Sequence, residues 1–141
     1  MWLFCPYTLG VIRALIVWFG LLALAIINGG IREGLIIPRT GDLAGHAIST
    51  ISLCVLILAL AWLTIGWMHP ASASEAWRIG GLWVALVLAF EFLAGHYLFG
   101  TPWSELLADY NVLRGRIWPL VLVTTAVAPY LAGRMRGLWS A

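Results

Sequence analysis

The stretch that decides the fold is WRIGGLWVALVLAFEFLAGHYLF, residues 77–99. It is as long and as apolar as a helix that crosses a bilayer, which needs about 20 residues. It nevertheless carries a carboxylic acid, Glu91, and an imidazole, His96. Because an ionisable group is costly inside the hydrocarbon layer, such groups face other helices or a water-filled space. The stretch therefore predicts a membrane-spanning helix with a protected polar side.

The composition of the whole chain agrees with a membrane protein. Of its 141 residues, 62% are hydrophobic and 10% are charged, whereas about a quarter of the residues of a soluble domain are charged. All basic residues other than histidine are arginines, and the net charge of +2 is too small to indicate a nucleic-acid partner. Neither cysteine stands in a metal-binding spacing, so both are expected to be small apolar side chains.

Four apolar segments have the length of a membrane span, and together they predict an all-α bundle of four transmembrane helices in a single domain. The expected spans are about residues 7–27, 43–67, 77–99 and 117–133. The sequence NGG at 28–30 is typical of a helix stop, Thr40 is a candidate N-cap of the second span, and Asp42 suits its first turn. Ser72 and Glu75 have the spacing of a capping box at the start of the third span.

A short amphipathic helix is expected between the third and fourth spans. Large apolar residues recur there at helical spacing, which favours a helix lying in the membrane interface. These residues are Trp103, Leu106, Leu107, Tyr110 and Leu113.

Four spans would place both termini and the 68–76 loop at one membrane face, here called side A, and the 28–42 and 99–116 loops at the other, side B. The arginines divide four against four between the two sides, so the positive-inside rule gives no orientation and permits both. The acidic residues gather on side B, which leaves a weak preference for cytoplasmic termini. The expected location is a bacterial-type inner membrane.

Polar side chains converge near side B. In the second span, Asp42, His46, Ser49 and Thr50 follow helical spacing and form one stripe, which is expected to face the protein interior. Helix packing with local hydrogen bonds would explain this stripe equally well. Because the second and third spans are antiparallel, His46 and His96 are expected at the same depth.

Glu91 is the most informative of these groups. Its carboxyl is expected either to be protonated or to be ionised and paired with Arg32, Arg114 or Arg116. The leading hypothesis is a small transporter or channel component with a protonatable or ion-binding site at Glu91. His46 and His96 would line its side B entrance, Arg32 would tune the charge of Glu91, and Asp42 is a further candidate for binding a proton or an ion. The other candidate pocket-lining residues are Asn28, Ser49, Thr50 and Arg114.

Two other classes of function remain open. One is a haem- or metal-binding redox subunit that uses His46 and His96 as ligands. Glu91 and His96 are five residues apart, about 140° around an α-helix, so they are not expected to act as paired metal ligands. The other is a structural membrane subunit without chemistry of its own. No catalytic constellation is recognisable, so an enzyme is not favoured. No cofactor is predicted, and the expected partners are lipid and a second copy or a membrane subunit.

Overall fold

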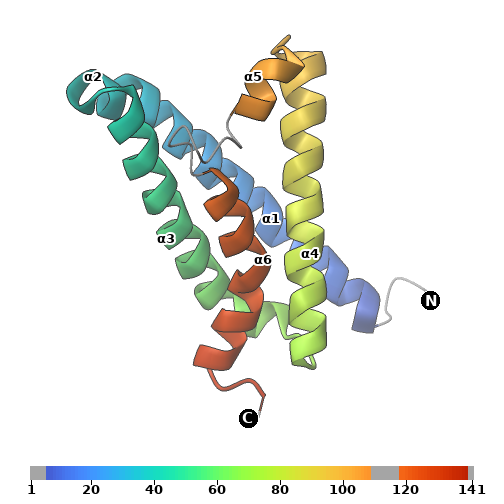
Figure 1. Ribbon diagram of the computed structural model, residues 1–141. Helices are drawn as coiled ribbons and strands as arrows, with labels where there is room; N and C mark the ends of the chain where they lie inside the picture. The colour runs from blue at the N-terminus through green and yellow to red at the C-terminus, as the bar shows by residue number, and fades with distance from the viewer. Residues whose placement is uncertain (1–5, 109–117, 140–141) are drawn as a thin grey trace.

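The computed structural model describes residues 6–108 and 118–139, and over these residues the chain forms helices and turns without a strand (Figure 1). The first long helix consists of α1, the π-helical segment η2 and α2. The second is α3, and the third consists of α4 and the π-helical segment η3. The elements are α1 (Pro6–Ile31), η2 (Arg32–Ile36), α2 (Ile37–Thr40), α3 (Asp42–Met68), α4 (Ala73–Ala89), η3 (Phe90–Leu98), α5 (Trp103–Ala108) and α6 (Trp118–Met135).

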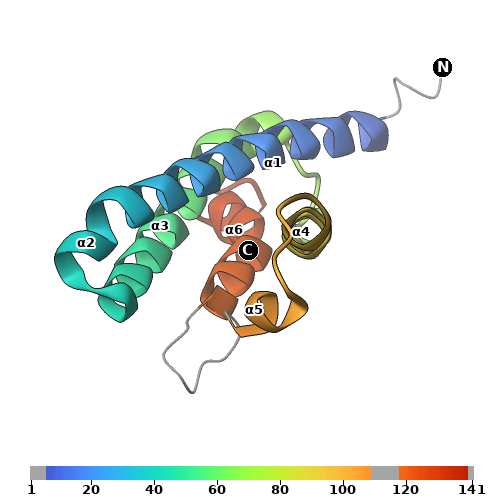
Figure 2. The same ribbon diagram turned by 90° about the horizontal axis from the view of Figure 1, so that it is seen from above.

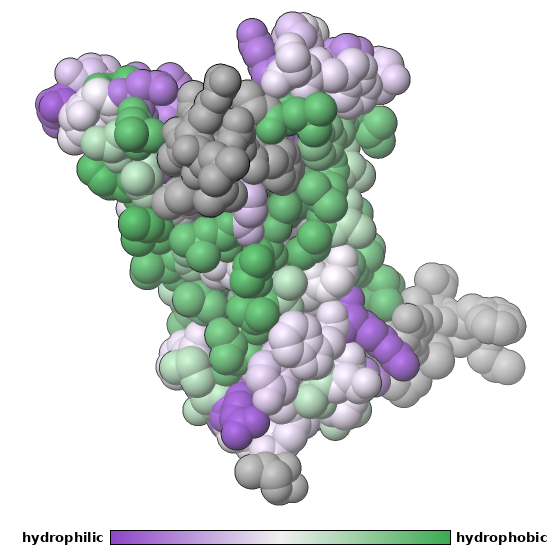
Figure 3. All heavy atoms as spheres, in the orientation of Figure 1, coloured by the Kyte–Doolittle hydropathy of each residue, from purple (hydrophilic) through white to green (hydrophobic). Residues whose placement is uncertain are grey.

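Three of the described helices have the length and composition of membrane spans. They are Gly10–Thr40, Asp42–Met68 and Ala73–Leu98, and they give the chain the character of a helical membrane bundle. The face drawn in Figure 3 shows hydrophobic residues over the middle of the molecule and hydrophilic residues near its two ends. The fourth long helix, α6, has 18 residues, so it extends for about 27 Å at 1.5 Å per residue.

The central helix of the bundle is α6. It packs against both α3 and α4, and α1 packs on α3 and crosses α4 (Figure 2). Trp83 of α4 is fully buried, and its Nε1 donates a hydrogen bond to the Ala14 carbonyl of α1 at 2.9 Å. The indole therefore joins α4 to α1 within the core.

α4 and α6 approach each other closely at Gly80. A Cβ added there would lie 2.0 Å from the carbonyl oxygen of Ala126, whereas a Cβ on the adjacent Gly81 would meet nothing within 4 Å. Glycine lets helix backbones touch in this way. The absence of a side chain is therefore required for this contact at Gly80 and not at Gly81.

The expected helix stop at residues 28–30 is wrong, because α1 continues through Asn28, Gly29 and Gly30 to Ile31. Asn28 is buried and bonded to α3, and this packing holds the helix together where local propensity would end it. The chain turns instead at Gly41, whose φ of 92° lies in the region that glycine tolerates. Thr40 is not an N-cap: its Oγ1 donates to the Ile36 carbonyl at 2.7 Å, within the last turn of α2.

The signals at the other helix starts are confirmed. Ser72 Oγ accepts a hydrogen bond from the Glu75 N–H at 3.3 Å, and Glu75 Oε2 accepts one from the Ala71 N–H at 2.7 Å. This is the expected capping box, with the reciprocal bond one residue earlier than in the usual motif. Asp42 lies in the first turn of α3.

The short helix α5 follows η3 where an amphipathic helix is expected. It covers Trp103–Ala108, and the remaining residues of that expected helix lie outside the described part of the chain. Leu106 of α5 packs on Gly95 of η3, since a Cβ on Gly95 would lie 2.9 Å from Leu106 Cδ2. α5 thus folds back on η3, the end of the third long helix.

The C-terminal segment returns to the turn between α3 and α4. Trp139 Nε1 donates to the Pro70 carbonyl at 3.2 Å, and the Arg136 guanidinium donates to the Trp62 carbonyl at 3.0 Å. The end of α6 and this turn therefore lie at the same end of the bundle, which is called side A below, whereas α2 and α5 lie at the opposite end, called side B (Figure 1).

Candidate functional site

A buried polar contact joins α1 to α3. Ser49 Oγ donates a hydrogen bond to Asn28 Oδ1, and the two residues are 0% and 8% exposed. Thr50, the next residue of the expected stripe, is 5% exposed. The structure thus brings together two of the predicted pocket residues, Asn28 and Ser49, inside the bundle.

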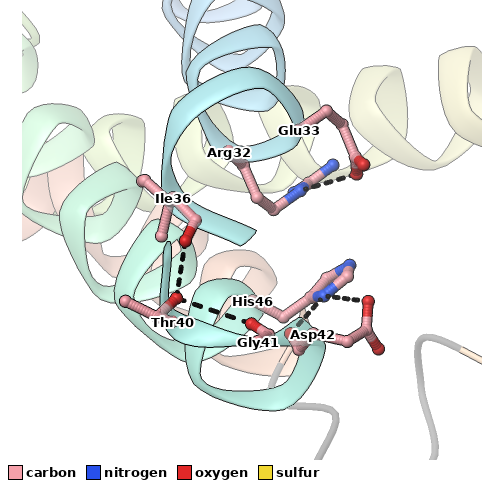
Figure 4. A network of polar contacts seen from close by, with 7 residues as sticks. All are labelled: Arg32, Glu33, Ile36, Thr40, Gly41, Asp42 and His46. Carbon is pink, nitrogen blue, oxygen red and sulfur yellow. Dashed lines mark hydrogen bonds and ion pairs between the residues drawn. The ribbon is translucent and has the colours of Figure 1, made fainter. Parts of the chain in front are cut away.

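The other half of the expected stripe lies at the surface of side B, at the start of α3 (Figure 4). His46 Nδ1 is 2.9 Å from the Asp42 carbonyl oxygen and 3.5 Å from its carboxylate. Because a carbonyl oxygen can only accept, Nδ1 donates this bond. The Asp42 side chain is 66% exposed and that of His46 is 22% exposed, so only the deeper part of the stripe enters the core.

Arg32 lies on η2 beside this histidine and pairs with its own neighbour. Its Nε is 3.3 Å from Glu33 Oε1, and Figure 4 shows the Arg32–Glu33 pair opposite the His46–Asp42 pair. The ion pair that the structure gives Arg32 is therefore with Glu33 of side B.

His96 connects the end of η3 to the segment that follows it. Its Nδ1 is 2.9 Å from the Thr101 carbonyl oxygen, and its ring stacks on Trp103 with a centroid distance of 4.0 Å. His46 begins α3 and His96 ends η3, and α3 and α4 pack on opposite sides of α6 (Figure 2). The structure does not bring the two histidines together.

Glu91 lines a cavity between the helices. The cavity has a volume of about 180 Å³ and takes residues from α1, α3, α4, η3 and α6. Its lining residues are Trp18, Leu21, Leu22, Ala25, Ile26, Leu53, Ile57, Val87, Phe90, Glu91, Val121 and Thr125. Trp18, Glu91 and Thr125 are the lining residues that carry polar side-chain atoms, and the wall of the cavity is almost entirely apolar.

Two further polar groups of this cavity were not expected to be functional. Trp18 is 7% exposed, and its Nε1 has no hydrogen-bond partner among the residues that the structure describes. Thr125 is 1% exposed and donates its hydroxyl proton to the Val121 carbonyl at 2.7 Å, which leaves its oxygen able to accept. A buried donor without a partner costs free energy.

The π-helical conformation of η3 changes the geometry around Glu91. Residues of a π-helix bond to the fifth residue before them, as the Phe99 N–H does to the Ala94 carbonyl at 3.0 Å. The angle around the helix axis between side chains five positions apart is therefore smaller than in an α-helix. The expected 140° between Glu91 and His96 assumed a regular α-helix and does not hold over η3.

The cavity and the buried polar contact are adjacent along two helices. Ala25 lines the cavity and Asn28 follows it by less than one turn of α1, while Leu53 lines the cavity and Ser49 precedes it by about one turn of α3. The Asn28–Ser49 pair thus lies between the Glu91 cavity and side B.

Arg114, a predicted pocket residue, lies outside the described residues. Within residues 6–108 and 118–139, no group of three or more His, Cys, Asp or Glu side chains is placed to hold a metal ion.

Comparison with protein families, curated proteins and solved structures finds no significant match.

Proposed function

We propose that this protein is a membrane transport protein, either a carrier or a channel subunit, in which Glu91 binds a proton or a small cation. The observation that carries the proposal is that Glu91, an acidic residue, lines a cavity between the helices of a bundle whose long helices have the composition of membrane spans. Ionisable groups placed in this way recur along ion and proton pathways, because lipid gives them no partner.

The groups around the cavity suit that role. Trp18 and Thr125, which carry a hydrogen-bond donor and an acceptor, line the same cavity as Glu91, and a volume of about 180 Å³ exceeds what one water molecule or a small ion requires. Glu91 is also in the first turn of η3, and π-helical segments are frequent at functional sites.

The proposal includes four membrane spans. α6 would be the fourth, because it lies at the centre of the bundle and ends beside the turn between α3 and α4. α5 would lie in the side B interface, with the exposed side chains of Trp103 and Leu107 toward lipid. The larger number of acids on side B favours termini at the cytoplasmic face.

The proposal is tested by Glu91→Gln, which keeps the shape of the side chain and removes its charge and its acidic proton. Purified protein is placed in liposomes, and flux of H⁺, Na⁺ or K⁺ is driven by a membrane potential and read with a trapped dye selective for the ion that is tested. We expect wild-type flux with one of these ions and at least about a tenfold loss in Glu91→Gln.

The matched control is Glu105→Gln, which changes an exposed acid of α5 and is expected to retain wild-type flux. All variants are compared at equal helix content and equal monodispersity. The proposal is contradicted by unchanged flux in Glu91→Gln, or by wild-type vesicles that match protein-free vesicles for all three ions.

A further inference from the structure

A second and larger cavity opens at side A, away from Glu91. It has a volume of about 530 Å³ and lies between the start of α1, the end of α3 with the turn after it, and the first turns of α4. Its lining residues are Gly10, Val11, Arg13, Ala14, Met68, His69, Pro70, Glu75, Arg78, Ile79 and Leu82. This volume is in the usual range for ligand sites, about 300–1,000 Å³.

The inner end of this cavity is fixed by the contact between α1 and α4. Trp83 donates to the carbonyl of Ala14, and Ala14 itself lines the cavity together with Leu82. From this contact the two helices separate toward side A, and the cavity occupies the space between them. The cavity is therefore a wedge between two membrane helices that is open toward the membrane surface.

The charged groups of the cavity are mainly cationic. Arg13 comes from α1 and Arg78 from α4, and His69 lies on the turn between α3 and α4. Arg13 is held in place, because its Nη1 donates to the Trp67 carbonyl at 2.8 Å and its guanidinium lies 5.3 Å from the centre of the Trp67 ring. A guanidinium has five N–H donors, so most of those of Arg13 remain for another acceptor.

The single carboxylate that lines the cavity is already engaged. Glu75 Oε2 accepts the Ala71 N–H at 2.7 Å as part of the capping box of α4. Its negative charge also lies at a helix N-terminus, where the helix dipole stabilises it. Two arginines therefore line the cavity together with one acidic residue, Glu75, whose carboxylate serves the helix cap.

Most of the lining of the cavity is apolar. Val11, Ile79 and Leu82 contribute to this apolar wall together with Ala14. The space thus combines cationic groups near the membrane surface with a hydrocarbon-lined interior. Basic pockets of this kind between membrane helices bind the headgroups of acidic lipids.

We propose that this cavity binds an anionic phospholipid. The phosphate would lie between Arg13 and Arg78, and an acyl chain would extend along Val11, Ile79 and Leu82. A free phosphate would use the two arginines alone and leave the apolar walls without an occupant. The site is separate from the Glu91 cavity, so the proposal does not depend on transport.

The test measures lipid binding to the detergent-purified full chain, by native mass spectrometry and by the shift in its thermal unfolding. The probes are phosphatidylglycerol, phosphatidylcholine and inorganic phosphate. We expect phosphatidylglycerol to bind more tightly than the other two. Arg78→Gln should weaken its binding about fivefold, the loss expected for one arginine near an acidic headgroup.

Two further variants separate a cavity from a charged surface. Gly10→Leu removes no charge, and a Cβ at Gly10 meets nothing within 4 Å, so it fills the cavity without a backbone clash and should also weaken binding. The control is Arg134→Gln, an exposed arginine of side A outside the cavity that donates to the Tyr130 hydroxyl at 2.8 Å, and it should change affinity less than twofold.

Any of four results overturns the proposal: equal binding of phosphatidylcholine, equal stabilisation by inorganic phosphate, an Arg134→Gln effect as large as that of Arg78→Gln, or unchanged binding by folded Gly10→Leu. The first result would show that the cavity does not recognise the charge of the lipid, and the second that the acyl chain contributes nothing to binding. The last two reduce the effect to general surface attraction.

Discussion

Single polar residues of the bundle satisfy their hydrogen bonds in two ways. Ser52, Thr64 and Thr125 each donate to the carbonyl four residues earlier in their own helix. Ser49 instead donates across to Asn28, a residue of another helix. The first kind of bond lets a hydroxyl face any environment, and the second fixes how two helices are rotated relative to one another.

Removing the hydroxyl that crosses between helices should therefore cost stability. Ser49→Ala leaves Asn28 Oδ1 buried without its donor, and we expect the free energy of unfolding to fall by about 1 to 2 kcal/mol. The measurement is reversible unfolding in mixed micelles followed by circular dichroism. Ser52→Ala serves as its control, because Ser52 is exposed and bonded to its own helix; its change should stay below about 0.5 kcal/mol. Equal effects of the two substitutions would show that the Asn28–Ser49 bond contributes nothing specific.

At the scale of the helix, two long helices change from α- to π-helical geometry as they approach side B. η2 follows α1, and η3 follows α4. Each π-helical segment shifts the direction in which later side chains point, which moves His96 relative to Glu91. Extended apolar sequence specifies a helix, but it does not specify whether each turn holds the usual number of residues.

The contact between α4 and α6 depends on one missing side chain. Gly80→Ala would put a methyl group 2.0 Å from the Ala126 carbonyl oxygen, so the two backbones must separate. We expect the free energy of unfolding to fall by at least about 2 kcal/mol, as overpacking does in other cores. Gly81→Ala is the matched control. Its methyl group meets nothing within 4 Å, and alanine favours a helix over glycine by about 0.5–1 kcal/mol, so its unfolding free energy should not fall. Unfolding measurements that rank the two variants in the opposite order would refute the close contact.

For the molecule as a whole, the position of α6 decides the topology. α6 packs between α3 and α4, and Trp139 beyond its end bonds to the turn before α4. If α6 crosses the bilayer, the end of α6 and the start of α4 share one side, and α5 lies on the other. The equal number of arginines on the two sides permits the chain to insert in either orientation. In both orientations the end of α6 and the start of α4 share one side of the membrane, and α5 lies on the other.

Cysteine labelling tests this arrangement. Ser74→Cys, Ser104→Cys and Met135→Cys each place one thiol at an exposed position in a chain with Cys5 and Cys54 replaced by alanine. A membrane-impermeant maleimide is applied to sealed vesicles before and after permeabilisation. We expect equal labelled fractions at positions 74 and 135 and the complementary fraction at position 104. If position 135 follows position 104 instead, α6 does not cross, and the four-span proposal fails.

The sequence alone determined that the chain is a helical membrane bundle, that a capping box at Ser72 and Glu75 begins the third long helix, and that Glu91 lies within an apolar helix. These properties follow from apolar length and from contacts between near neighbours. The tertiary structure decided that the first helix continues through Asn28 to Gly30. It also decided that Ser49 bonds to Asn28, while His46 and His96 lie apart. Trp18 and Thr125 line the same cavity as Glu91 for the same reason. Helix rotation, π-helical register and the choice of neighbours depend on contacts between distant residues, such as Trp83 with Ala14 at a separation of 69 positions. Local patterns do not encode these contacts, because every face of an apolar helix is equally compatible with lipid until another helix packs against it.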